Sequence, residues 1–185
     1  SIKTLYKDGA NTLWIGTNEG LFKIDNLENP VIEKCNLPAK YQIYSIEKLN
    51  DDSLLLGTKQ HGIIKYSVGS GSIDFFKDKN DKAILTNIYV RSIFHDTTTN
   101  LIWIGAFNGL YIYNLDYQKV SHYQHNPDDP TTLSNNSIYS IHKDKKGSFW
   151  IGTYHGGVNF WDASNNNFEH YTSSELKNSL SHHTV

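Results

Sequence analysis

The sequence predicts an all-β fold, a β-propeller of four four-stranded antiparallel blades, from three observations. A string close to Trp-Ile-Gly-Thr occurs four times, and its glycines, at positions 16, 57, 105 and 152, stand 41, 48 and 47 residues apart. Short apolar runs rich in β-branched and aromatic residues are bounded by Gly, Asn, Asp and Pro, which is the pattern of strands joined by turns. No segment shows the sustained 3.6-residue periodicity of a long helix.

Each repeat holds four such runs, which is the content of one propeller blade. An alternating apolar run is predicted as the first strand of each unit, over residues 2–5, 43–46, 90–93 and 138–141. The recurring string is predicted as the second strand, over residues 14–17, 55–58, 103–106 and 150–153. The third strands are expected at 21–24, 63–66, 110–113 and 158–161, and the fourth at 31–32, 73–76, 120–123 and 168–171.

These strands divide the chain into blades at approximately 1–36, 41–80, 86–125 and 136–173. Residues 178–185 resemble 132–138, the segment that leads into the fourth unit, so 174–185 is interpreted as the lead-in to a further blade. We therefore expect the chain to be a fragment of a larger propeller, cut at a blade boundary.

The repeated tryptophans and glycines are interpreted as architecture. Trp14, Trp103 and Trp150 share one repeat position, where a large flat side chain can fill the space between blades. The glycines interrupt strand-like runs, which indicates a close backbone approach or a bulge. Because no helix follows them, they are not expected to form a phosphate-binding loop.

Composition excludes several classes of partner. The net charge is −2 with 19% charged residues, so this region is not expected to contact nucleic acid. No apolar run approaches the roughly 20 residues of a membrane span. Cys35 is the single cysteine, so an internal disulfide is impossible, and we interpret it as a half-buried apolar filler.

The combined motifs resemble a known family. The pattern Asp-x-x-Gly, Leu-Trp-Ile-Gly-Thr, Gly-Leu-x-x-Tyr is similar to the two-component regulator propeller repeat, and residues 126–136 resemble its inter-blade loop. The fourth unit, 138–171, matches best. The second unit departs most, because Leu55 replaces the tryptophan and Asp51-Asp52-Ser53 replaces the usual glycine turn.

This resemblance implies a sensor. It implies a propeller that is often seven-bladed, in the periplasmic part of a hybrid two-component system, followed by a membrane span, a histidine kinase core, a receiver and a DNA-binding output module. Many such regions sense products of polysaccharide breakdown. The resemblance thus implies periplasmic localisation, a membrane connection only through a downstream part, and kinase activity in the parent protein and not in this fragment.

Catalytic alternatives have weaker support in the residues. The segment 144–150 resembles the Asp-box of sialidases, but those enzymes need an arginine cluster, and Arg91 is the only arginine. The acidic residues lie mainly in turns without an evident pairing for glycoside hydrolysis, and no Gly-x-Ser-x-Gly elbow occurs. The nine histidines lack a zinc-like spacing. We therefore predict no catalytic residue, metal or cofactor.

Binding is the better prospect. The turns between the second and third strands differ in sequence among the units, whereas the glycines that flank them recur. These turns carry the candidate ligand-binding residues Asn18, Glu19, Gln60, His61, Phe107, Asn108, Tyr154 and His155, with Lys59 beside Gln60. An early position of the first strand supplies a second ring, with Tyr44, Arg91 and Tyr139 as candidates and Lys3 at the same position. The alternatives are ordinary turn chemistry for the turns and solvated strand starts for the ring. An exposed aromatic beside an amide or imidazole can stack on a sugar and hydrogen-bond its hydroxyls.

Two functional hypotheses follow, from different classes. The first is a sensing domain for a glycan-derived small ligand that signals through an attached kinase. The second is a structural or protein-interaction platform without a ligand site of its own, and a propeller glycosidase or lyase comes third. Blades cut from a ring expose sheet faces, so we expect an open arc or, by self-association, a dimer, in preference to a small closed ring.

Overall fold

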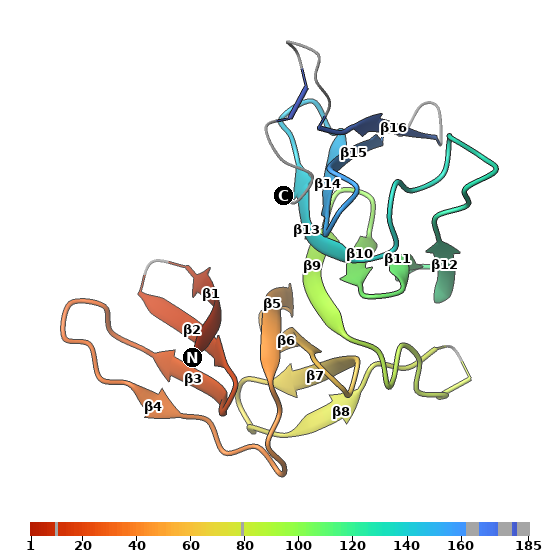
Figure 1. Cartoon of the computed structure of the whole chain (residues 1–185). Helices are drawn as coiled ribbons and strands as arrows, with labels where there is room; N and C mark the ends of the chain where they lie inside the picture. Colours follow the sequence, from red (N-terminus) through yellow and green to blue (C-terminus); the bar gives the residue numbers. More distant parts are fainter. Residues whose placement is uncertain (10, 79, 162–166, 174–178, 181–185) are drawn as a thin grey trace. The chain divides into compact units, whose positions relative to one another are not determined.

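The protein was examined as a computed structural model, which describes residues 1–9, 11–78, 80–161, 167–173 and 179–180 (Figure 1). The described residues form sixteen strands in four antiparallel four-stranded sheets, so the predicted all-β propeller class is confirmed. The chain divides into two compact units, Ser1–His95 and Asp96–Val185. No helix in the described part is long and apolar enough to cross a membrane.

Two sheets follow one another in the first half of the chain. The first sheet has the order β1 (Ile2–Asp8), β2 (Thr12–Thr17), β3 (Gly20–Ile24) and β4 (Glu33–Lys34). The second has the order β5 (Ile43–Asn50), β6 (Ser53–Thr58), β7 (Ile63–Ser67) and β8 (Ile73–Phe75). Each strand pairs with the next in the sequence, which is the meander of a propeller blade.

The third and fourth sheets repeat this order. The third comprises β9 (Val90–Asp96), β10 (Leu101–Ala106), β11 (Gly109–Asn114) and β12 (Lys119–Tyr123). The fourth comprises β13 (Ile138–Lys143), β14 (Phe149–Thr153), β15 (Val158–Trp161) and β16 (Phe168–Tyr171). Residues 174–178 and 181–185 of the predicted lead-in to a further blade lie outside the described residues.

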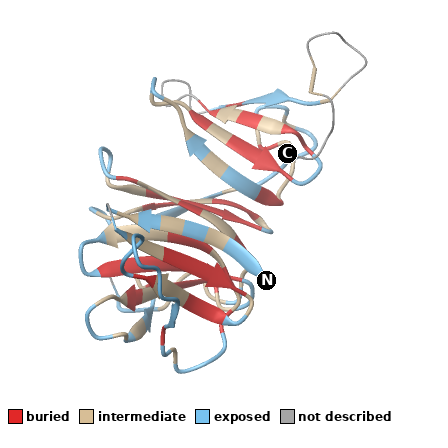
Figure 2. Cartoon of the chain, turned by 90° about the vertical axis from the view of Figure 1, so that its left-hand side faces the viewer, coloured by how far each residue is buried: buried red, intermediate tan, exposed pale blue. Residues whose placement is uncertain are grey.

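Burial falls from the second strand outward to the fourth within each sheet (Figure 2). All six residues of β6 are buried, as are five of the six in β10, whereas β4 is exposed throughout. A strand covered on both faces must be apolar on both faces. The recurring second-strand string is therefore apolar and continuous instead of alternating.

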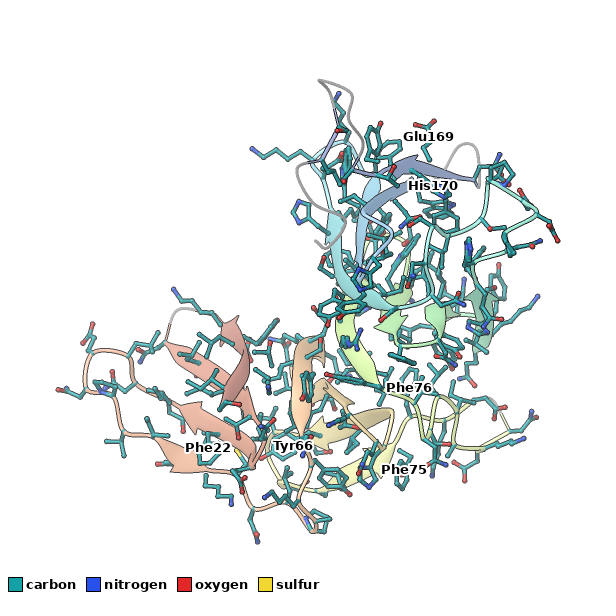
Figure 3. All side chains as sticks on the ribbon, in the orientation of Figure 1. Phe22, Tyr66, Phe75, Phe76, Glu169 and His170 are labelled. Atoms are coloured by element: carbon teal, nitrogen blue, oxygen red, sulfur yellow. The ribbon has the colours of Figure 1, made fainter. Side chains whose placement is uncertain are left out.

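The tryptophan prediction is confirmed at two repeats. Trp14 is 2% exposed and packs edge-on against Tyr66, with ring centroids 5.8 Å apart. Tyr66 belongs to the second sheet and is labelled in Figure 3. Trp103 is fully buried and stacks on Phe149 of the fourth sheet, with centroids 3.7 Å apart. Cys35, predicted as half-buried, is fully buried and joins the core around Trp14.

Trp150 is used differently. It is half-buried, and its indole N–H donates to the Asp144 carboxylate at 3.0 Å. The same carboxylate accepts the backbone N–H groups of Lys146 and Ser148, at 2.9 and 3.0 Å. The residues that resemble an Asp-box therefore close the turn between β13 and β14.

The repeated glycines allow the next blade to approach, as predicted. A Cβ placed on Gly16 would lie 2.8 Å from the Ile43 side chain, and one on Gly105 would lie 2.6 Å from Ile138. Gly57 has the same relation to Val90, at 2.8 Å. Each of these distances is shorter than a van der Waals contact, so a larger residue would push the neighbouring first strand away.

A half-buried carboxyl in the first unit predicts a pH-dependent stability. Burial raises the pKa of Glu47, on β5, to about 7, from an ordinary value of 4.5. Between these values the unfolded chain has lost the proton and the folded chain keeps it, so stability falls as pH rises, by on the order of 3 kcal/mol in total. We expect Glu47→Gln to stabilise the protein at pH 8 and to have little effect at pH 4.

Urea unfolding at both pH values measures this difference. Glu28→Gln, at an exposed loop position, is the control and should behave as the wild type at both pH values. Equal stabilisation by Glu47→Gln at pH 4 and pH 8 would contradict a titration effect.

Candidate functional site

One edge of each sheet gathers the predicted binding positions. The first strand pairs with the second so that Ile2 lies opposite Thr17, Ile43 opposite Thr58 and Ile138 opposite Thr153. The start of the first strand and the turn after the second strand therefore share an edge, which we call the rim. The sequence predicts both sets of candidates, and the register places them together.

The threonine of the recurring string builds the rim turn. The Thr58 hydroxyl donates to the Gly62 carbonyl at 2.9 Å and accepts the His61 backbone N–H at 2.9 Å. Thr17 and Thr153 make the corresponding pairs of bonds. One repeated side chain thus fixes the turn backbone, while the residues between it and the glycine are free to vary.

A bulge directs the second ring of candidates. The ladder between the first and second strands shifts register between Ile2 and Thr4, between Ile43 and Ser45, and between Ile138 and Ser140. The inserted residues are Lys3, Tyr44 and Tyr139. Because a bulge re-aims the extra side chain, these residues leave the alternation of the strand and lie at the rim.

Five rim residues of the first unit form a group that we call the cationic cluster: Lys3, Tyr44, Lys59, Tyr89 and Arg91. The Lys3 ammonium lies 5.1 Å from the Tyr44 ring centroid, and the Arg91 guanidinium lies 4.5 Å from that of Tyr89. The two tyrosine rings meet edge-on, 4.8 Å apart. The cluster combines groups from β1, β5, β9 and the turn after β6.

The charges of this cluster act on its phenols. A hydrogen bond with Tyr89 lowers the pKa of Tyr44, and the positive charges of Lys3 and Lys59 lower it further. Burial and the same hydrogen bond raise the pKa of Tyr89 to about 12. Tyr44 therefore accepts the hydrogen bond that the Tyr89 hydroxyl donates, in a locally positive environment.

Three rim residues of the second unit form an aromatic platform: Tyr139, Tyr154 and His155. The rings of Tyr139 and Tyr154 are stacked, with centroids 5.6 Å apart and planes 16° apart. Their side chains stay 41% and 44% exposed, respectively. The His155 ring packs edge-on against the Tyr154 ring, with ring centroids 4.0 Å apart.

The candidates of the first two turns are partly engaged in structural contacts. The Asn18 amide donates to the Ser1 hydroxyl at 3.2 Å, and Glu19 forms an ion pair with Lys40 at 2.8 Å. Glu19 also lines a cavity of about 350 Å³ beside Cys35 and Lys40. His61 packs edge-on against Tyr41, whereas Gln60 is exposed.

The third turn carries one exposed and one structural candidate. Phe107 is 60% exposed. The side-chain amide of Asn108 donates to the Tyr111 hydroxyl at 2.8 Å. The backbone carbonyl of Asn108 accepts a hydrogen bond from the Gln124 side-chain amide at 3.1 Å. Asn108 thus holds the turn against the outer strands.

Sequence reasoning does not single out Tyr89. It lies one residue before β9, and the equivalent residues of other blades have a shared role. The carbonyls of Ser1, Gln42 and Ser137 each accept the N–H of the first residue in the rim turn. The residue before each first strand is therefore a rim position, which the repeat alignment could have indicated.

The described residues hold no group of three or more His, Cys, Asp or Glu side chains that could bind a metal ion. The arrangement at the rim is instead one of aromatic faces, cations and hydroxyl groups. Such groups recognise polar ligands by stacking and hydrogen bonding, without covalent chemistry.

These features define a propeller domain whose repeated scaffold carries a variable rim. Comparison with known proteins shows what this domain is similar to. Residues 132–155 match the model of the two component regulator propeller family. The chain is 28% identical over 166 residues to histidine kinase P4 of Formosa agariphila, covering 86% of this chain and 11% of that protein.

Solved structures agree. The extracellular domain of a protein named as a hybrid two-component system of B. thetaiotaomicron is 26% identical, with a TM-score of 0.76 over 96% of this chain and 22% of its own. A second such domain from that organism, at 23% identity and a TM-score of 0.76, matches 100% of this chain and 23% of its own. A GH74 enzyme of Niastella koreensis, at 14% identity and a TM-score of 0.66, shares the fold alone.

The predicted resemblance is confirmed: residues 132–155 match the two component regulator propeller model, and the chain resembles the extracellular domain of a protein named as a hybrid two-component system. It spans about a tenth of the curated relative and about a fifth of the matched extracellular domains.

Proposed function

We propose that the chain is part of the periplasmic sensing region of a hybrid two-component system and that it recognises an oligosaccharide released from a polysaccharide. The observation that carries this proposal is the aromatic platform, an exposed tyrosine pair on a rim built by repeated residues. The names of the similar extracellular domains support the extracytoplasmic location, and the name of the curated relative supports an attached kinase.

The chemistry of the platform suits a sugar ring. Tyr139 and Tyr154 present flat apolar faces, and both carry a hydroxyl group that can donate or accept. His155 adds a ring nitrogen beside them. Exposed aromatic rings lose little conformational entropy on binding, because a tyrosine has only two side-chain torsions.

Replacing either tyrosine with alanine should weaken binding. We expect Tyr139→Ala and Tyr154→Ala to lower the affinity for a recognised neutral or charged oligosaccharide by about tenfold or more, the usual result of removing an aromatic contact. Isothermal titration with a panel of oligosaccharides measures this effect. Tyr117→Ala is the matched control, because Tyr117 is 77% exposed in the turn after β11, at the opposite edge of its sheet.

Equal loss of binding in Tyr117→Ala would indicate a nonspecific surface effect. Failure of every oligosaccharide to bind would contradict the sensing proposal and favour the interaction-platform alternative. Signal transmission requires that the ligand bind two states of the parent protein with different affinity. Self-association as a dimer stays a prediction that light scattering can check.

A further inference from the structure

We propose that Asn135, in the segment that leads into the fourth sheet, is a further ligand-binding residue, and that its side-chain amide binds the hydroxyl groups of a sugar stacked on the aromatic platform. This inference rests on the proposed function and adds a contact at the edge of the sugar ring. It is carried by the bonds and contacts that hold residues 134–137, which we call the lip, against the rim turn of the fourth sheet.

A buried asparagine on β15 fastens the lip. The fully buried side chain of Asn159 accepts the Ser134 backbone N–H at 2.8 Å and donates to the Ser134 hydroxyl at 2.9 Å. The other three sheets carry an apolar or aromatic residue at this position of the third strand: Phe22, Ile64 and Tyr111. A buried amide is costly in a strand unless its polar atoms are hydrogen-bonded. Asn159 therefore fixes the position of the lip.

A glycine in the rim turn makes room for the lip. A Cβ placed on Gly156 would lie 2.4 Å from the Ser134 hydroxyl oxygen and 2.9 Å from the Asn135 Cβ. The same place in the rim turn of the second sheet is taken by His61, whose ring packs against Tyr41. The fourth turn thus leaves open the space that a side chain fills in the second turn, and the lip enters this space.

Two further hydrogen bonds connect the lip with the platform. The Ser137 carbonyl accepts the Tyr154 backbone N–H at 2.9 Å, and the side-chain carbonyl of Asn135 accepts the Ser137 backbone N–H at 2.8 Å. Tyr139 follows Ser137 by two residues. Asn135 is therefore linked through a single residue to both tyrosines of the platform.

The amide nitrogen of Asn135 is the group that is offered to the sugar. The side-chain carbonyl is engaged by Ser137, and within the described part of the chain the amide nitrogen donates to no acceptor. An amide N–H donates to hydroxyl oxygens, which a sugar presents along its edge when its face lies on an aromatic ring. Because the turn already orients Asn135, binding costs little side-chain entropy.

An NMR titration of the intact chain tests this contact directly. Cellotetraose, laminaritetraose, mannotetraose and tetragalacturonate are added in separate titrations. The side-chain amide resonances of Asn135 are followed together with the ring resonances of Tyr139 and Tyr154. We expect any tetrasaccharide that shifts the tyrosine rings to shift the Asn135 amide with the same midpoint. Ring shifts without a response of Asn135 overturn the inference and leave the saccharide function standing.

Asn135→Ser separates ligand binding from structure. A serine hydroxyl can still accept the Ser137 backbone N–H, whereas the amide donors are lost. We expect the same tetrasaccharide to bind about fivefold to tenfold more weakly, as the loss of one hydrogen bond implies, without a change in the midpoint of urea unfolding. Asn126→Ser is the matched control, because Asn126 accepts the Asp128 backbone N–H at 3.1 Å in the same type of turn. Equal affinities of the two variants overturn the inference.

Gly156→Ala tests the position of the lip while Asn135 is kept. The φ angle of Gly156 lies outside the left-handed region, so the substitution acts through the methyl group that displaces Ser134. We expect weaker binding and a smaller shift of the Asn135 amide, and wild-type values of both overturn the role of the lip. If none of the four tetrasaccharides shifts the tyrosine rings, the saccharide function fails and the inference fails with it.

Discussion

Replacing Lys143 with methionine should lower the free energy of unfolding by about 3 to 5 kcal/mol, because it leaves a buried carboxylate without its countercharge. The Lys143 ammonium, on β13, contacts the Asp96 carboxylate at 2.6 Å, and the Asp96 side chain is only 5% exposed. The hydroxyls of Thr98 and Thr99 donate to the same carboxylate at 2.6 and 2.7 Å. These two bonds remain in the variant, so we expect the lower part of the range.

The pH dependence tests the same interaction. Burial alone would raise the pKa of Asp96, but the hydrogen bonds from Lys143, Thr98 and Thr99 outweigh it and lower the pKa to about 2, from an ordinary 3.8. A lowered folded-state pKa stabilises the protein above about pH 4, and this contribution, roughly 2 kcal/mol, is lost as the pH falls through 2. In Lys143→Met the folded-state pKa of Asp96 rises back toward its ordinary value, so the loss of stability between about pH 4 and pH 2 should be smaller than in the wild type.

The repeat supplies a control at the equivalent position. Lys48 pairs with Asp8 at 3.1 Å, but these side chains are 32% and 23% exposed. Because solvent screens the pair, Lys48→Met should cost about 1 kcal/mol or less. Urea unfolding of both variants measures the difference, and equal costs would show that burial of Asp96 does not govern the effect.

The second large effect is expected from Gly105→Ala, which should destabilise the protein by about 2 to 3 kcal/mol. The new methyl group would lie 2.6 Å from Ile138 Cγ2 and 3.1 Å from its Cβ. Ile138 is fully buried at the start of β13, so it has little space into which it can move. The cost should appear in the denaturation midpoint without a change in slope.

A control and a double variant make this prediction specific. Gly69→Ala should be nearly neutral, because no atom lies within 4 Å of its added Cβ. Ile138→Ala removes the Cγ2 methyl group at the contact, so Gly105→Ala should cost less in that background than in the wild type. Additive costs would show that the two side chains do not meet.

Much of the fold can be predicted from the sequence because residues of the same type recur at equivalent positions of the four repeats. Gly16, Gly57 and Gly105 share a position where the next strand approaches, and Trp14 and Trp103 share one where blades pack. Such contacts are made between neighbouring blades in the same geometry, so a structural role inferred for a residue in one repeat applies to the equivalent residue of another. Trp150 departs from this pattern, because a carboxylate within its own sheet accepts its indole N–H.

The location of the candidate site could be predicted from the sequence, but the contacts among its residues could not. The varying turn residues and the early first-strand position both lie at the rim, since an antiparallel register places the start of one strand beside the end of the next. Which candidates meet was not predictable, because side-chain contact depends on the bulge and on the packing of separate segments. Asn108 and Tyr154 occupy similar turn positions, yet one braces the turn and the other stacks on Tyr139.

By itself, the sequence determined the all-β propeller class, the four-strand unit and the structural role of its glycines, because these follow from local strand chemistry repeated at a fixed period. Only the tertiary structure decided the grouping of Lys3, Tyr44, Lys59, Tyr89 and Arg91, and the stacking of Tyr139 on Tyr154. The physical reason is that these contacts join residues far apart in the chain. Their distances are set by the pairing and packing of whole strands.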